Sequence, residues 1–178
     1  MKRNSMLRLG ATVSLVAITT GVAISAQDKY TLKLPDGLPF ADWRGYEDWQ
    51  LISSSKTDDR MKVILGNATI IAAFKAGIPG NGKPFPEGSK IAKVQWKPKK
   101  STEAPFAVDV PDTLADLFFM EKDSTRFPQT GGWGYAQFDY DPASATYTPD
   151  KAGTPNCGQV CHVAVKAKDY VFHPYQKR

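Results

Sequence analysis

The feature that most constrains this chain is a short segment near its C-terminus, Cys157-Gly158-Gln159-Val160-Cys161-His162. It holds both cysteines of the chain and one of its two histidines. Two thiols followed directly by a histidine are typical of c-type haem attachment, in which the thiols bond to the vinyl groups and the imidazole binds iron. The common spacing has two residues between the cysteines, whereas this chain has three. We expect a local bulge to absorb the extra residue, and Gly158 tolerates one.

A disulfide is the alternative interpretation of the same two cysteines. Two cysteines in an exported protein commonly pair, and a loop this short can close, although often under strain. The histidine that follows them would then be a coincidence. A structural zinc site is not expected, because a single pair of cysteines does not supply enough ligands.

The N-terminus has the pattern of a secretory signal peptide. Basic residues in Met1–Arg8 precede an apolar run over Leu9–Ile24 and a small-residue exit at Ser25 and Ala26. We therefore predict a signal peptide over residues 1–26 and a haem-binding cytochrome domain over residues 27–178. The protein is expected to be periplasmic, where c-type haem is attached, and nothing after the signal is apolar enough to span a membrane.

The charge balance does not favour a nucleic-acid partner. Removal of residues 1–26 takes Lys2, Arg3 and Arg8 but no acidic residue, so the formal net charge falls from +5 to +2. The remaining basic run over residues 97–100 is short and contains a proline. It is interpreted as a solvated loop, with docking of an acidic redox partner as the alternative.

The hydrophobic pattern predicts an α+β fold, a single domain built mainly from an antiparallel β-sheet with a few short helices. Alternation in Ser89–Trp96 predicts a strand that places Ile91, Lys93 and Gln95 on one face. A helix is expected over Ala68–Ala76, capped by Asn67. The other expected elements are strands at Tyr30–Leu34, Leu51–Ser55, Arg60–Gly66, Phe106–Val110 and Trp133–Tyr140, a strand or helix at Leu114–Met120, a short helix or turn at Phe40–Trp49, a linker over 142–156 and a helix at Val163–Tyr170.

The residue opposite His162 on the iron would decide the function of a bound haem. The spare ligands are Met61, Met120 and His173; packing explains the methionines, and His173 is interpreted as a surface or packing residue. An open iron site is therefore expected, and a simple electron carrier is the weaker alternative. Lys93 has two interpretations: a solvent-facing side chain, or a desolvated amine that faces the cofactor and acts as a nucleophile.

Several segments in order resemble the cytochrome P-460 family, c-type cytochromes in which a lysine is joined covalently to the haem. The resemblance covers most of the mature chain, from Arg60 to the C-terminus. The segments that carry it are Arg60 at the start of a strand before a helix, Gly88-Ser89-Lys90-Ile91-Ala92-Lys93, Asp123-Ser124-Thr125-Arg126-Phe127, Gly132-Trp133-Gly134-Tyr135, Cys157…Cys161-His162 and Ala167-Lys168-Asp169-Tyr170-Val171-Phe172.

The resemblance implies one covalent haem c per chain in a homodimer, held by Cys157 and Cys161, with His162 as the iron ligand. Lys93 would form the cross-link, with Lys90 as its rival, and Arg60 would be a polar residue on the open side. Lys93 and Arg60 are thus the expected catalytic residues.

The implied activity is oxidation of hydroxylamine to nitrous oxide or nitric oxide, with electrons passed to a soluble acceptor such as a cytochrome c. Asp150 and Asp141 are candidate proton acceptors. The alternative is a gas-binding protein similar to cytochrome c′-β, which has the same fold, lacks the lysine link and binds nitric oxide or carbon monoxide. Neither interpretation includes a nucleic acid or a membrane.

Overall fold

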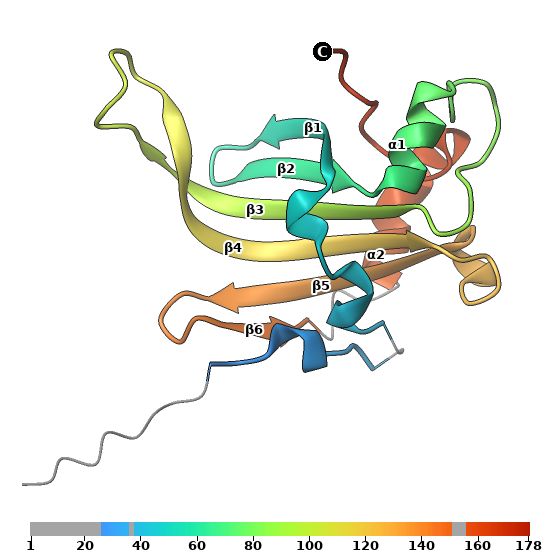
Figure 1. Cartoon of the computed structure of the whole chain (residues 1–178), viewed down its shortest axis with the longest axis horizontal. Helices are drawn as coiled ribbons and strands as arrows, with labels where there is room; N and C mark the ends of the chain where they lie inside the picture. The colour runs from blue at the N-terminus through green and yellow to red at the C-terminus, as the bar shows by residue number, and fades with distance from the viewer. Residues whose placement is uncertain (1–25, 36–37, 151–155) are drawn as a thin grey trace, which may run out of the picture.

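One antiparallel sheet dominates the protein, whose computed structural model describes residues 26–35, 38–150 and 156–178. The sheet has six strands in the order of the sequence, each paired antiparallel with the next. Figure 1 shows them as one twisted layer. The strands are β1 (Gln50–Lys56), β2 (Met61–Gly66), β3 (Lys90–Lys100), β4 (Asp109–Lys122), β5 (Trp133–Asp141) and β6 (Thr146–Pro149).

This architecture confirms the predicted α+β class with a mainly antiparallel sheet. It also resolves the ambiguity at Leu114–Met120, which together with the end of Phe106–Val110 forms the single long strand β4. β3 and β4 pair along almost their whole length, and their hairpin extends beyond the neighbouring strands, to the left in Figure 1. Phe106 in this hairpin is 73 % exposed.

Two expectations differ from the structure, one in the N-terminal and one in the C-terminal part of the chain. The predicted linker over 142–156 contains the short strand β6, which pairs with β5; residues 151–155 lie outside the described part. The predicted strand at Tyr30–Leu34 begins instead within the 3₁₀-helix η1 (Lys29–Thr31), which Asp28 caps by accepting a hydrogen bond from the Tyr30 N–H. The predicted signal peptide lies outside the described residues except for Ala26.

The N-terminal segment covers one face of the sheet with aromatic side chains. It contains the 3₁₀-helices η2 (Phe40–Trp43) and η3 (Tyr46–Asp48), as the aromatic-rich pattern predicted. Trp43 stacks on Phe119 of β4 with ring centres 4.7 Å apart, and Phe40 lies 4.7 Å from Phe138 of β5. Phe40, Trp43 and Phe138 have no exposed surface, so this face is closed.

The opposite face is covered at one end by helix α1 (Ala68–Lys75) and by the C-terminal segment. Asn67 caps α1 as predicted, because its side chain accepts a hydrogen bond from the Ile70 N–H. Ile70 and Ile71 of α1 pack with Ile64, Ile91 and Met120 of the sheet and with Tyr170 and Val171 of the C-terminal segment. This second cluster closes only part of the face.

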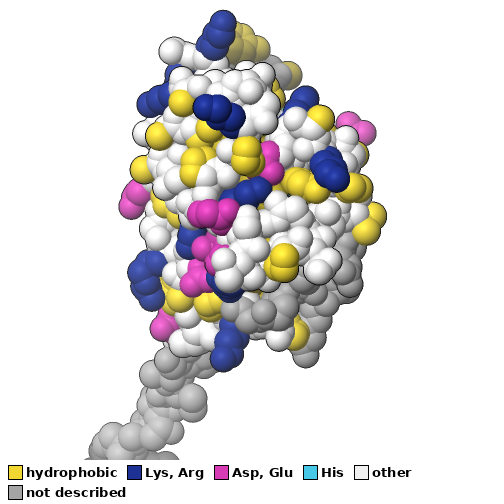
Figure 2. All heavy atoms as spheres, turned by 90° about the vertical axis from the view of Figure 1, so that its right-hand side faces the viewer, with side chains coloured by type: hydrophobic (Ala, Val, Ile, Leu, Met, Phe, Trp, Pro, Cys, Tyr) yellow, Lys and Arg dark blue, Asp and Glu magenta, His cyan; other side chains and the backbone are white. Residues whose placement is uncertain are grey.

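The end of the sheet near α1 carries charges of both signs. Lys90 and Arg126 pair with Glu121 at 3.1 and 3.4 Å. Figure 2 views this end of the molecule and shows acidic side chains gathered near its centre with basic side chains around them. Within the part of the chain that the structure describes, no helix has the length and apolar composition needed to cross a bilayer.

Candidate functional site

A cavity of about 450 Å³ opens on the partly covered face of the sheet, next to the cluster formed with α1. Its volume lies in the range usual for sites that bind small molecules and cofactors. Strands β2 to β5 form its floor, and the helix α2 (Asn156–His162) and the C-terminal segment form its wall. The residues that line it include Ile64, Lys93, Phe118, Met120, Tyr135, Gln137, Asp150, Cys161, His162, Phe172 and His173.

The attachment segment lies on α2, and its geometry corrects one expectation. The three-residue spacing is absorbed by a regular helix, in which Cys157 and Cys161 lie one turn apart, and not by a bulge. Gly158 is needed for a different reason: a Cβ atom there would lie 2.4 Å from the Tyr135 ring. Glycine therefore allows α2 to lie directly against β5.

Cys161 has a free thiol that is exposed and borders the cavity. This arrangement gives no support to the disulfide interpretation. A free thiol at the wall of a cavity is instead what attachment of a cofactor requires. The side chain of Cys157 lies outside the described residues.

His162 is half-buried between two aromatic rings, with ring centres 5.1 Å from Tyr135 and 4.7 Å from Phe172. Its Nδ1 atom lies 2.6 Å from the carbonyl oxygen of Tyr170. Because a carbonyl only accepts, Nδ1 carries the proton and Nε2 keeps its lone pair. Burial lowers the pKa of His162, and the positive charge of Lys93 lowers it further. A neutral imidazole held through Nδ1 is the form that binds a metal.

The described residues include no group of three or more His, Cys, Asp or Glu side chains that could hold a metal ion. His162 would therefore act as a single protein ligand. A haem iron needs only this, because the ring supplies the other ligands.

Lys93 lies on β3, where its direct neighbours are Ile64 on β2 and Phe118 on β4. The side chain is half-buried and lines the cavity, with Nζ 3.8 Å from the centre of the Phe118 ring. Burial and the nearby charge of Lys62 lower the pKa of Lys93. The structure thus places Lys93 as a desolvated amine at the cavity and not as a fully solvent-facing side chain.

Lys90, the rival of Lys93, projects from the opposite face of the sheet. Its Nζ donates a hydrogen bond to the Asp42 carbonyl at 2.8 Å and pairs with Glu121 at 3.1 Å. The three-residue offset between the two lysines reverses the face, as strand geometry requires. Only Lys93 is positioned at the cavity.

Arg60 lies just before β2, beyond the residues that line the cavity. It forms an ion pair with Asp59 at 3.0 Å, and its Nε atom lies 3.9 Å from Asp116. Asp116 is half-buried on the cavity face of β4, and burial raises its pKa. Arg60 therefore reaches the site through Asp116 rather than by lining it.

The two candidate proton acceptors occupy different places. Asp150 lines the cavity, and its backbone N–H donates a hydrogen bond to Gln137 at 3.0 Å. Asp141 is the last residue of β5, where its carboxylate accepts hydrogen bonds from the Ala143 N–H and the Ser144 hydroxyl. The structure thus brings Asp150, but not Asp141, to Lys93 and His162.

The structure also separates the three spare iron ligands. Met120 and His173 line the cavity. Met61 lies three residues before Ile64 on β2, and an odd offset along a strand reverses the face, so Met61 lies on the closed face. Phe118, Gln137 and Asp116 were missed as site residues. Asp116 and Phe118 belong to Leu114–Met120, which the sequence left as a strand or a helix. The pairing of β4 with β3 and β5 that aligns these residues with Lys93 was not visible in the sequence.

The comparison with protein families agrees with this geometry. The sequence model of the Cytochrome P460 family matches residues 43–173, which is most of the chain. A comparison with curated proteins found no match. The family implies a haem cofactor, and the cavity, the free Cys161 thiol and the imidazole with its available Nε2 atom fit such a group. The chain belongs to the cytochrome P460 family.

Proposed function

We propose that the protein oxidises hydroxylamine to nitrous oxide or nitric oxide at one haem c per chain, attached through Cys157 and Cys161. His162 would be the iron ligand. The observation that carries the proposal is the position of Lys93, which faces the cavity shared with Cys161 and His162. The bound haem would supply a redox-active iron with one open position and a ring that the lysine nitrogen can join.

The environment of Lys93 supports its role in the cross-link. Bonding of the lysine nitrogen to a ring carbon would replace a C–H bond and release two protons and two electrons to an external oxidant. The nitrogen reacts through its lone pair, so the side chain must first lose its proton. Burial and Lys62 lower the pKa of Lys93 and thus increase the unprotonated fraction near neutral pH. Ile64 and Phe118 on the neighbouring strands hold the side chain within the cavity.

Oxidation of hydroxylamine releases protons as well as electrons, so the site needs a proton acceptor. Asp150 is the proposed acceptor, because its side chain borders the same cavity and its backbone is held by Gln137. Arg60 is proposed to act through Asp116 by fixing the charge at this edge of the site.

Gas binding without catalysis, as in cytochrome c′-β, is the second candidate. The apolar side chains of Ile64 and Phe118 favour it, since they place a water-poor surface beside the cavity. The two candidates differ in whether Lys93 bonds to the haem.

We further propose that the protein is exported to the periplasm by the segment over residues 1–26 and acts there as a homodimer. A soluble cytochrome c is the proposed electron acceptor. The small net charge of the mature chain is consistent with a soluble protein partner rather than a nucleic acid.

The test compares Lys93→Ala with Lys90→Ala as a matched control. Intact mass and absorption spectra are recorded for both variants and the unmodified protein, followed by hydroxylamine turnover. We expect a main absorption band far to the red of ordinary c-type haem, lost with turnover in Lys93→Ala and retained in Lys90→Ala.

Two other outcomes have clear meanings. An ordinary five-coordinate spectrum in the unmodified protein, with haem mass attached, would favour gas binding. Absence of haem mass from the purified protein would overturn both candidates and return the cysteines to the disulfide interpretation.

A further inference from the structure

Two consecutive residues after the 3₁₀-helix η5 (Val163–Lys168) have left-handed backbone conformations. The φ angles are +47° at Asp169 and +64° at Tyr170. Neither residue is glycine, and a side chain makes this conformation unfavourable, most of all for a bulky residue. Such a conformation persists only where surrounding contacts hold it in place, and it occurs often at functional sites.

This turn presents the carbonyl group that orients His162. The N–H groups of Asp169 and Tyr170 bond back to Lys166 and Val165, so the chain reverses immediately after η5. The Tyr170 carbonyl then lies 2.6 Å from the Nδ1 atom of His162. The position of this oxygen determines both the tautomer of His162 and the direction of its ring.

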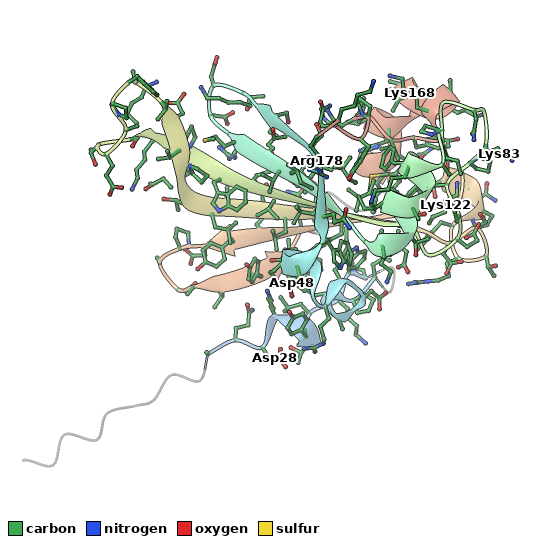
Figure 3. All side chains as sticks on the ribbon, turned by 45° about the horizontal axis from the view of Figure 1, so that its top comes forward. Asp28, Asp48, Lys83, Lys122, Lys168 and Arg178 are labelled. Carbon is green, nitrogen blue, oxygen red and sulfur yellow. The ribbon has the colours of Figure 1, made fainter. Side chains whose placement is uncertain are left out.

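A buried ion pair holds the first residue of the turn. The Asp169 carboxylate pairs with Lys122 Nζ at 2.8 Å and accepts a hydrogen bond from the Phe85 N–H at 2.7 Å. The Lys122 side chain is only 5 % exposed. Figure 3 shows Lys122 at the same end of the molecule as Lys83 and Lys168, where the C-terminal segment lies against the sheet.

The same region of the sheet holds the second residue. Lys122 Nζ also donates a hydrogen bond to the carbonyl oxygen of Gly131, in the connection between β4 and β5. The Tyr170 ring lies against Gly131 so closely that a Cβ atom there would be 2.2 Å from the ring carbon Cε2. Asp169 is thus held by the end of β4 and by Phe85, and Tyr170 packs against the β4–β5 connection.

We infer that the Lys122–Asp169 ion pair positions the iron-binding histidine by fixing the strained turn that carries the Tyr170 carbonyl. The pair touches neither the cavity nor His162, so its effect passes through the backbone of residues 169–170. This role explains why a lysine and an aspartate that are distant in sequence are buried together. It rests on the proposed function of His162 as the iron ligand.

The experiment uses the haem-loaded protein and compares Lys122→Met with Lys90→Met. Both lysines form a partly or fully buried ion pair, but Lys90 lies on the opposite face and has no link to His162. The readouts are the iron–histidine stretching band of the reduced protein, seen by resonance Raman spectroscopy, and the midpoint potential. If the Lys122–Asp169 pair contributed only to overall stability, the folded molecules of Lys122→Met would keep the iron–histidine band and the midpoint potential of the unmodified protein.

We expect Lys122→Met to lower the frequency of this band and to broaden it. Loss of a partner that orients a metal-binding histidine typically weakens metal binding by about 10- to 100-fold. The histidine donates most strongly to ferric iron when Nδ1 is well bonded, so the midpoint potential should rise. Each tenfold loss of preference for ferric iron corresponds to about 59 mV. Lys90→Met should match the unmodified protein in both readouts.

Two further variants keep the test decisive if Lys122→Met does not fold. Gly131→Ala displaces the Tyr170 ring without removing a charge and should shift the band in the same direction. Lys122→Arg keeps the charge and should restore the band toward that of the unmodified protein.

A band in Gly131→Ala and Lys122→Met identical to that of the unmodified protein would overturn the inference and leave the proposed function intact. Absence of an iron–histidine band from the unmodified protein would instead reject His162 as the ligand. The two failures are therefore distinguishable.

Discussion

The two faces of the sheet are built from the same strands but differ in what they enclose. On the closed face, Ala92 and Val94 of β3 pack with the aromatic side chains of the N-terminal segment. On the other face, Ile91 and Lys93 of the same strand border a cluster that ends at an open cavity. The two faces differ both in the side chains that the strands present and in the segments that cover them.

This contrast shows how one sheet provides both rigidity and a reactive site. The closed face has ring-to-ring packing around Phe119, which contacts Phe40, Trp43 and Tyr46. The cavity face contains half-buried Lys93 and His162, both with pKa values lowered by burial. Uncharged forms of these two groups are what the proposed chemistry requires.

The strongest test of the contrast uses two neighbouring phenylalanines of β4. Phe119→Ala removes a ring that is 1 % exposed on the closed face and should reduce the free energy of unfolding by about 3–5 kcal/mol. Phe118→Ala removes a half-buried ring that already borders the cavity, so it should lower stability by less than about 2 kcal/mol. Urea unfolding of both variants measures the difference, and equal losses would contradict the distinction between the faces.

The contact between α2 and the floor offers a second test. Gly158→Ala places a Cβ atom 2.4 Å from Cγ and 2.7 Å from Cβ of Tyr135, which lie next to the backbone of β5, so rotation of the ring does not relieve the contact. Overpacking costs about 1–3 kcal/mol, which at least offsets the gain of about 1 kcal/mol from replacing glycine in a helix.

We therefore expect a net loss of up to about 2 kcal/mol in Gly158→Ala by thermal or urea unfolding. Val160→Ala is the control on the same helix, since Val160 is 72 % exposed, and its effect should stay within about 0.5 kcal/mol. A stabilised Gly158→Ala would show that α2 is able to move away from β5.

The smallest expected effect concerns His173 at the edge of the cavity. Burial and the charges of Lys93 and Lys62 lower the pKa of His173 in the folded protein. In the unfolded chain the histidine pKa is about 6.5. At pH values between the lower pKa of the folded protein and about 6.5, the unfolded chain therefore binds more protons than the folded protein. Stability contributed by the neutral imidazole is present above about pH 6.5 and decreases as the pH falls.

His173→Gln should lose less stability than the unmodified protein when the pH falls from about 7.5 to about 5.5, a range that spans the usual histidine pKa. Urea midpoints at the two pH values measure this difference. A steeper loss in His173→Gln would mean that the sign of the pKa shift is reversed. The charged groups that lower the pKa of His173 are Lys93 and Lys62. Lys62→Gln should therefore also lose less stability than the unmodified protein over this pH range.

Much of the fold could be predicted because its signals are local. Alternation identified β2 and β3, strands were also predicted at the positions of β1 and β5, and Asn67 followed by an apolar period identified α1. β4 remained ambiguous at Leu114–Met120 because a short apolar run fits either a helix or a strand; pairing with β3 decided it. β6 was missed because its four residues are stabilised by pairing with β5 and not by their own pattern.

The sequence by itself determined three features of the protein: the attachment motif Cys157…Cys161-His162, the strand face shared by Ile91, Lys93 and Gln95, and membership of the family. These depend on residue identity and on the two-residue period of a strand, which are local properties. Only the tertiary structure decided that this face borders a cavity, that Lys90 is engaged elsewhere and that the Tyr170 carbonyl meets His162. Those facts depend on register and on contacts between residues far apart in the chain, and no local pattern encodes them.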